Sequence, residues 1–264
     1  MKSNEQPKDT EKGYCGHGNK PPCTKCLEKH EKMQSSREYV HSPVLQDVLR
    51  DRIIFEREVL SDSDVLLIGD GQGLDTKQFI DMGVEPDHIS SVNYESSEVD
   101  EANRRLEETG VVMKQADATS WDSLLRAGVL EASQDVLVLL HVLEVSDIRS
   151  DAERRLVENM VRVLRDGGEA LVSQYKHKLT QEQATMLGIE EIKPEYLERR
   201  FGKDWQEIFT REYGQPWYEG MRYSEISRIR SKDELLKLFS DHFEINLEET
   251  DDSYVLKLKK KVSR

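Results

Sequence analysis

Short apolar runs alternate with helical patterns through residues 60–175, and this alternation restricts the chain to a small set of folds. The first run, residues 65–68, leads into a glycine-rich turn at residues 69–73, after which apolar residues recur at helical spacing. Four more runs are typical of buried strands: residues 89–94, 111–114, 136–140 and 170–173. Strands that alternate with helices pair in parallel through right-handed crossovers. We therefore expect an α/β fold with a doubly wound, mostly parallel sheet.

The carboxyl-terminal part of the chain has a different pattern. Residues 243–248 and 254–259 flank a turn, which predicts an antiparallel hairpin at the sheet edge and brings the expected strands to seven. Between the fifth strand and this hairpin lies an insertion, residues 178–225. Capping-box spacing at Asp204 and Glu207 predicts a short helix within it. We expect the insertion to form a helical lid.

The amino-terminal residues divide into three parts. Residues 1–13 are polar and are expected to be a disordered tail. Residues 14–34 contain all three cysteines, and the main domain is expected over residues 42–264, beginning with a helix. The sequence has no apolar run of the roughly 18 residues that a membrane span needs and no signal-like amino terminus, so we expect a cytoplasmic protein.

Four potential metal ligands lie close together in the amino-terminal segment. Cys15, His17, Cys23 and Cys26 offer sulfur and imidazole ligands within 12 residues, and a Cys-x-x-Cys pair directs both sulfurs at one ion. The pattern predicts tetrahedral zinc, and four protein ligands make the site structural. Metal binding would supply the folding free energy of so short a segment. The alternatives are His30 in place of His17, a redox cysteine pair, or a surface thiol cluster.

Charge bears on the class of partner. The chain has 52 acidic and 38 basic residues, a net charge of -14, so its body repels a phosphate backbone. This balance favours a small-molecule substrate. The first 40 residues are different, with eight basic and six acidic side chains, and their lysines make RNA or an acidic protein an alternative partner. The oligomeric state stays open at this stage.

The glycine-rich turn is typical of a ligand-binding loop. Gly69, Gly71 and Gly73 let the backbone turn tightly and approach a ligand, while the next helix presents free N–H groups. A dinucleotide fingerprint requires a third small residue at position 74, where this chain has Leu74. The turn therefore disfavours a nicotinamide cofactor.

The order of segments resembles that of the class I S-adenosylmethionine-dependent methyltransferases over about residues 60–260. The resemblance rests on five motifs: VLLIGDGQG (65–73), SVNYE (91–95), KQADATSW (114–121), DVLVLLHVLEV (135–145) and RVLRDGGEALVS (162–173). It implies a Rossmann-like fold and S-adenosylmethionine as the cofactor. The residues that it places at the cofactor are Gly69, Asp70, Gly71, Gly73, Asn93, Tyr94, Glu95, Asp117 and Ala118.

Within this resemblance, Asp117 would bind the adenine amino group and the Ala118 backbone a ring nitrogen. The chain departs from the family at Leu67 and Asn93, where an acidic residue is usual. Asn93 stands at the position that binds the ribose hydroxyls. Because a charge-assisted hydrogen bond is about twice as strong as a neutral one, either cofactor affinity is reduced or Glu95 substitutes.

Methyl transfer to a nucleophile depends mainly on positioning and on exclusion of water, and a hydroxyl acceptor also needs a base. His141 ends the fourth strand, and ligands of parallel sheets bind at the carboxyl ends of strands. His141 is therefore the candidate catalytic base, with contact to cofactor or substrate as an alternative role. Tyr175 and His177, just past the fifth strand, are candidate substrate contacts.

The insertion is rich in aromatic residues. Eight of the 18 in the chain are there: Tyr196, Phe201, Trp205, Phe209, Tyr213, Trp217, Tyr218 and Tyr223. Such rings could cover the site and contact a sulfonium, or form a small core of their own. We expect a mixture, with Trp217 and Tyr218 nearest the substrate.

Three hypotheses follow. The leading one is methyl transfer to a small-molecule acceptor. The second is an RNA or protein methyltransferase that docks its substrate through the zinc segment. The third, prompted by Leu67 and Asn93, is a non-catalytic cofactor-binding scaffold.

Overall fold

A computed structural model describes residues 62–145, 150–178, 192–222, 225, 228–250 and 253–262. The expected tail, the helix before the first strand and the predicted zinc ligands Cys15, His17, Cys23 and Cys26 lie outside these residues. Within them, there is no group of three or more His, Cys, Asp or Glu side chains suited to hold a metal ion. None of the described helices is both long enough and apolar enough to cross a membrane.

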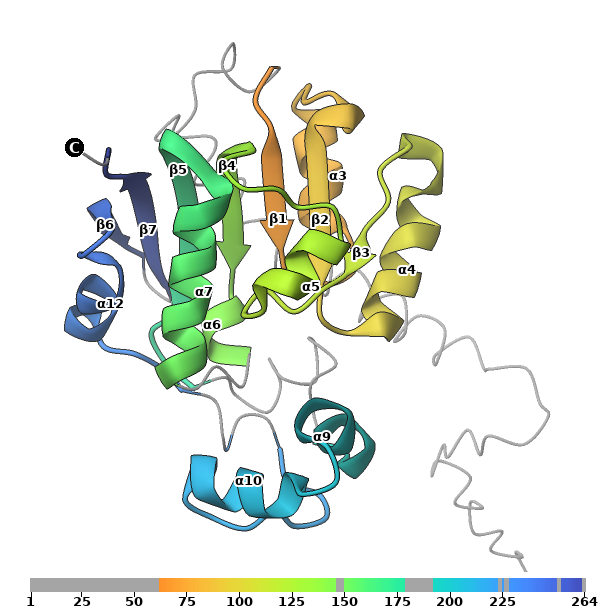
Figure 1. Cartoon of the computed structure of the whole chain (residues 1–264), viewed down its shortest axis with the longest axis vertical. Helices are drawn as coiled ribbons and strands as arrows, with labels where there is room; N and C mark the ends of the chain where they lie inside the picture. Colours follow the sequence, from red (N-terminus) through yellow and green to blue (C-terminus); the bar gives the residue numbers. More distant parts are fainter. Residues whose placement is uncertain are drawn as a thin grey trace, which may run out of the picture.

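Seven strands form one mixed sheet in the order β3-β2-β1-β4-β5-β7-β6 (Figure 1). Their bounds are β1 (Val65–Ile68), β2 (Ile89–Asn93), β3 (Lys114–Gln115), β4 (Gln134–Leu140), β5 (Leu164–Tyr175), β6 (Phe243–Glu249) and β7 (Ser253–Lys260). Strands β1 to β5 pair in parallel, whereas β7 runs antiparallel between β5 and β6. The predicted seven-stranded sheet with its terminal hairpin is therefore confirmed.

The helices of the described residues connect these strands and extend beyond them. They are α3 (Leu74–Asp81), η1 (Pro86–His88), α4 (Ser96–Leu106), η2 (Glu107–Thr109), α5 (Trp121–Arg126), α6 (Val142–Val145), α7 (Ser150–Val163), α9 (Pro194–Phe201), α10 (Trp205–Tyr213) and α12 (Lys232–Phe239). The order of strands in the sheet places β2 and β3 on one side of β1, and β4 and β5 on the other. The switch between β1 and β4 is the place where open α/β sheets bind ligands.

Two differences from the expected elements have local causes. The third strand was expected at residues 111–114, but β3 begins at Lys114. The backbone of Met113 is bonded to the Asn103 side chain instead of a neighbouring strand: its N–H donates to Asn103 Oδ1 at 2.8 Å, and its carbonyl accepts from Asn103 Nδ2 at 3.0 Å. The capping box expected at Asp204 is wrong, since the Asp204 side chain makes no capping bond to α10. The capping box that forms is at Ser231, at the start of α12.

Alternate residues of the strands are buried on opposite faces of the sheet, as expected for a parallel sheet covered on both sides. Leu66 of β1 belongs to a cluster with Leu156 of α7 and Leu235 of α12. Its neighbour Leu67 packs in a second cluster with Phe79 of α3. Figure 1 shows α5 and α7 in front of the sheet. This packing fixes the strands whose carboxyl ends carry the candidate site.

The insertion has a core of its own. Helices α9 and α10 bury Leu197, Trp205 and Phe209 against one another, and Trp217 packs against this cluster. Trp205 and Trp217 meet edge to face at 5.5 Å, and Trp217 Nε1 donates to the Ile192 carbonyl at 3.0 Å. In Figure 1 these helices lie beyond the carboxyl ends of the strands. Of the two roles considered for the aromatic residues, the described side chains support a local core.

Candidate functional site

Backbone hydrogen bonds continue past the strand ends and bring the candidate residues together along one edge of the sheet. Gly69 N–H donates to Val92 O, and Ala116 N–H donates to Asn93 O, both at 2.8 Å. On the other side, His141 N–H donates to Ser173 O at 3.1 Å. The segment after β3, the end of β2, the glycine turn after β1 and the end of β4 therefore lie in this order along the edge.

The glycine turn has a backbone that favours glycine at three positions. The φ angles of Gly69, Gly71 and Gly73 are 74°, 52° and 80°, in the left-handed region. A Cβ on Gly69 would lie 2.4 Å from Val142 Cγ2, and one on Gly73 would lie 3.0 Å from Leu106 Cδ1. A Cβ on Gly71 would have no described atom within 4 Å. The outer glycines thus permit helix packing, whereas Gly71 faces space that a ligand can fill.

The side chain of Asp70 is directed into the protein. Its buried carboxylate accepts the N–H groups of Asp75 and Thr76, at 2.9 and 3.0 Å, and the Thr76 hydroxyl. It also lies 3.5 Å from the Ser91 hydroxyl, which donates to it. The carboxylate therefore holds the turn against the first turn of α3, and contact with a cofactor would come from the Asp70 backbone.

Two carboxyl groups are buried beneath the turn. Burial raises the pKa of Asp70 to about 6, against the lowering effect of its hydrogen bonds. Burial, and then the negative charge of Asp70, raise the pKa of Asp75 well above its usual value. Asp75 Oδ1 is buried with no hydrogen-bond partner among the described residues. We therefore expect the stability around the turn to depend on pH.

Asn93 uses its amide within the protein. Its Nδ2 donates to Glu98 Oε2 at 2.7 Å and to the Gly71 carbonyl at 3.3 Å, and its Oδ1 accepts the Glu95 N–H at 3.4 Å. Tyr94 and Glu95, the other candidates after β2, are half-buried. The contact with Asn93 brings a carboxylate, that of Glu98, beside the glycine turn.

Sequence reasoning missed Glu98. Its signal was its place at the third position of α4, since an acidic residue there commonly reaches back toward the residues before the helix. The sequence could not show that this carboxylate would meet Asn93 rather than solvent. That contact depends on how α4 packs against β2.

The segment after β3 is held from two helices. Asp117 N–H donates to Ser123 Oγ of α5 at 3.0 Å, and Asn159 of α7 donates to the Ala118 carbonyl at 2.8 Å. Asp117 Oδ1 accepts the N–H and the hydroxyl of Thr119, at 2.9 and 2.8 Å. The half-buried Asp117 carboxylate is therefore oriented before any ligand binds.

His141 and Tyr175 come together at the ends of β4 and β5. Their rings stack with centroids 3.9 Å apart and an interplanar angle of 21°. His141 is buried, and its φ of 53° lies in the left-handed region. Such a conformation costs a non-glycine residue on the order of 1–3 kcal/mol and is often found at functional sites.

The other predicted substrate contacts have different surroundings. His177 is exposed, two residues beyond Tyr175. Trp217 packs in the core of the insertion. Tyr218 is 49% exposed, and its hydroxyl binds the Glu225 carboxylate. The described structure thus stacks His141 on Tyr175 and packs Trp217 against the core of the insertion.

Known proteins resemble this chain in sequence and in structure. Residues 66–172 match the model of a methyltransferase domain family. A protein from Pyrococcus horikoshii OT3 has a similar structure, with a TM-score of 0.55, 15% identity, and coverage of 86% of this chain and 91% of that one. An S-adenosylmethionine-dependent methyltransferase from Methanosarcina mazei gives 0.52, 14% identity, and coverage of 84% and 98%. The chain has a Rossmann-like methyltransferase fold.

A putative methyltransferase from Bacillus halodurans is also similar, with a TM-score of 0.51, 12% identity, and coverage of 83% of this chain and 99% of that one. A comparison with curated proteins gives no match. The family match runs from β1 into β5, so the matched residues include the glycine turn, Asn93, Asp117 and His141. The insertion and the antiparallel hairpin lie beyond the matched residues.

Proposed function

We propose that this chain binds S-adenosylmethionine at the carboxyl edge of its sheet and transfers the methyl group to a small-molecule acceptor. The observation that carries the proposal is the glycine turn, in which Gly71 has open space at its Cβ position and its carbonyl accepts a bond from Asn93, with the oriented Asp117 carboxylate farther along the same edge. The family match over residues 66–172 supports the same cofactor.

The residues present suit this cofactor. The turn at Gly69, Gly71 and Gly73 would lie against its amino-acid part, with the Asp70 backbone between them. We assign the adenine to Asp117 and the Ala118 backbone. When bound, the cofactor supplies a methyl group on a cationic sulfonium, and the protein contributes positioning and the exclusion of water.

We assign the ribose to Glu98 together with Asn93, beside Tyr94 and Glu95. Asn93 donates to the Glu98 carboxylate at 2.7 Å, so this carboxylate is held beside the turn. Ribose hydroxyls donate to a carboxylate through charge-assisted bonds, which are about twice as strong as neutral ones. Glu98 would in this way supply the charge that Asn93 lacks.

Calorimetry with S-adenosylhomocysteine tests the cofactor site. Gly71→Leu would fill the space beside the turn, and we expect its affinity to fall at least about tenfold, a loss of about 1.4 kcal/mol. Gly83→Leu is the matched control, because Gly83 also has a left-handed φ, of 97°, and no described atom near its Cβ position. Each variant places a leucine at a positive φ, which carries a backbone cost of about 1–2 kcal/mol.

Retained affinity in Gly71→Leu would contradict the placement of the ligand. A wild-type protein that does not bind S-adenosylhomocysteine at millimolar concentration would contradict the proposed function itself. That outcome would favour a non-catalytic scaffold.

We place the acceptor beside His141 and Tyr175, between the sheet edge and the insertion. His141 would accept the proton of a hydroxyl acceptor, whereas an amine or thiolate would need positioning alone. The net charge of -14 supports a small molecule over a nucleic acid. Transfer of a labelled methyl group from S-adenosylmethionine to fractions of small metabolites, RNA and protein tests this choice, and label found in RNA alone would overturn it.

We also propose that Cys15, His17, Cys23 and Cys26 bind one structural zinc ion. The support is the ligand spacing. Metal analysis of the purified protein should give one zinc per chain, and less in Cys23→Ser. If Cys23→Ser also abolishes an affinity for RNA, the alternative of a macromolecular acceptor docked through this segment gains support.

A further inference from the structure

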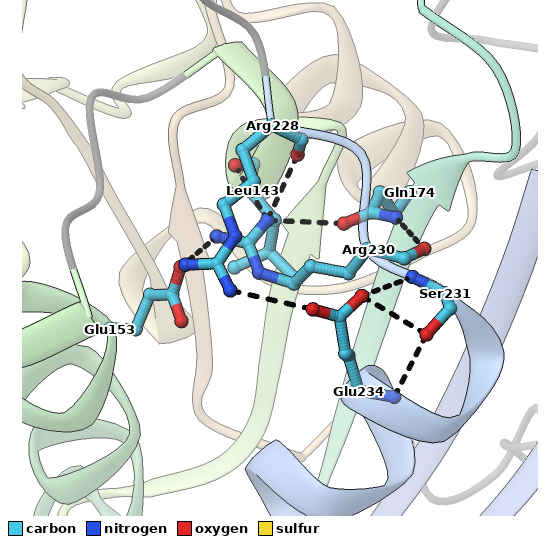
Figure 2. Close-up of polar contacts among 7 residues, drawn as sticks. All are labelled: Leu143, Glu153, Gln174, Arg228, Arg230, Ser231 and Glu234. Atoms are coloured by element: carbon cyan, nitrogen blue, oxygen red, sulfur yellow. Dashed lines mark hydrogen bonds and ion pairs between the residues drawn. The ribbon is translucent and has the colours of Figure 1, made fainter. Parts of the chain in front are cut away.

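Arg230 is buried at the point where the chain returns from the insertion to the sheet (Figure 2). Its side chain is 1% exposed. Nη1 donates to the Leu143 carbonyl and to Gln174 Oε1, both at 3.1 Å, and Nη2 pairs with the Glu153 carboxylate. Gln174 returns a bond from Nε2 to the Arg230 carbonyl at 3.0 Å. One side chain thus joins α6, β5 and α7.

The charges around Arg230 are balanced. Arg228 Nη1 also binds Glu153, at 3.1 Å, and Arg228 Nη2 lies 3.6 Å from Glu234. Two arginines and two glutamates therefore form a neutral network, as Figure 2 shows. Burial of a charge is tolerated when the charge is paired and hydrogen-bonded. Because Arg228 also contacts Glu153, that carboxylate keeps a cationic partner if Arg230 is replaced.

Arg230 also donates to the Arg228 carbonyl, at 3.3 Å, but its contacts with Leu143 and Gln174 are the ones that lead to the His141–Tyr175 pair. Leu143 follows His141 by two residues, and Gln174 directly precedes Tyr175. Leu143 lies in the short helix α6 (Val142–Val145), and the carbonyls of the last turn of a helix have no partner within it. Arg230 supplies that partner while holding the adjacent strand end. It therefore connects the two segments whose rings stack.

We propose that Arg230 is a positioning residue that keeps His141 in its left-handed conformation and stacked on Tyr175. A strained conformation persists where the surrounding structure imposes it. The constraints on His141 include its N–H bond to Ser173 O and the attachment of α6 to β5 through Arg230. The role of Arg230 at the acceptor site rests on the proposed function. The contacts of Arg230 and the stacking of His141 on Tyr175 do not.

Proton NMR of the His141 Hε1 signal tests the proposal, because the ring current of a stacked tyrosine displaces that signal. His141→Gln identifies the signal, and Tyr175→Leu gives its unstacked position. We expect Arg230→Met to move the signal toward the unstacked position. Arg228→Gln is the matched control, since it removes a contact to Glu153 but leaves the bonds to Leu143 and Gln174, and it should not move the signal.

A folded Arg230→Met protein with the wild-type His141 signal would overturn the proposal. If Arg230→Met does not fold, Arg230→Lys replaces it, since a lysine keeps the charge beside Glu153 but lacks the fork that holds Leu143 and Gln174. We expect the same shift of the His141 signal in Arg230→Lys, and a wild-type signal in this variant would again overturn the proposal. Because the measurement needs no cofactor, failure of the wild type to bind S-adenosylhomocysteine would contradict the proposed function and leave this result standing.

Discussion

At the scale of single residues, the direction of a few buried polar side chains defines the candidate site. Asp70 and Asn93 lie in segments that resemble cofactor motifs, yet the side chains of both form hydrogen bonds with other groups of the protein. Asp70 fixes the glycine turn to α3, and Asn93 fixes it to β2 and holds Glu98. The ligand-binding edge is therefore formed by the groups that these two residues position.

The buried pair of Asp70 and Asp75 predicts a pH dependence of stability. The pKa of Asp70 is about 6 in the native state and 3.8 in the unfolded chain, so the native state holds this proton more tightly. The resulting stabilisation is full below pH 3.8 and is lost as pH rises through about 6. At 1.36 kcal/mol per pKa unit, it amounts to about 3 kcal/mol.

Asp75→Asn should reduce the further decline in the free energy of unfolding that the wild type shows at higher pH. The native pKa of Asp75 is also raised, so its ionisation costs stability as pH rises further. Urea unfolding from pH 5 to pH 9 should show a smaller decline in the variant than in the wild type. Parallel curves above pH 7 would show that Asp75 is not in this environment.

Asn93→Asp and Glu98→Gln test the assignment of the ribose. An aspartate at position 93 would face the Glu98 carboxylate and lose the bond to Gly71 O, so we expect weaker binding of S-adenosylhomocysteine by calorimetry. Glu98→Gln should weaken binding about tenfold through loss of a charged acceptor. Glu101→Gln, on the same helix and paired with Arg104, is the control. Tighter binding by Asn93→Asp would instead assign the ribose to residue 93 alone.

At the scale of elements, caps and packing place the helices around the sheet edge. Helix α12 begins with a capping box, in which Ser231 Oγ accepts the Glu234 N–H at 3.3 Å and Glu234 Oε2 accepts the Ser231 N–H at 2.8 Å. The same helix buries Leu235 and Phe239 in the main core. Since Ser231 adjoins Arg230, the cap also fixes the residue that joins α6 to β5.

Ser231→Ala should lower the free energy of unfolding by about 1 kcal/mol, the usual cost of a lost N-cap. In a protein of this size, that corresponds to a fall in Tm of about 2–4 °C. Ser240→Ala, at the other end of α12, is the matched control and is expected to stay within about 0.5 kcal/mol. Equal effects of the two substitutions would show that the capping box adds nothing.

At the scale of the whole molecule, the described residues form a main core around the sheet and a separate small core in the insertion. The sheet and its helices bury one apolar cluster on each face, whereas the insertion buries a small cluster around Trp205 and Phe209. The neutral network around Arg230 lies where the chain passes from the second to the first. This arrangement places the insertion beyond the strand ends, at the edge where ligands of such sheets bind.

The sequence by itself determined the elements whose signal is local. Apolar runs marked the strands, glycines marked the turn after β1, and alternation marked the terminal hairpin, because each depends on neighbouring residues and on burial of one face. The tertiary structure alone decided which groups meet. Glu98 reaches Asn93 and Asp70 turns inward because of how the helix after each strand packs against that strand. Arg230 holds the strand ends of His141 and Tyr175 because the fold brings together segments that are far apart in the chain.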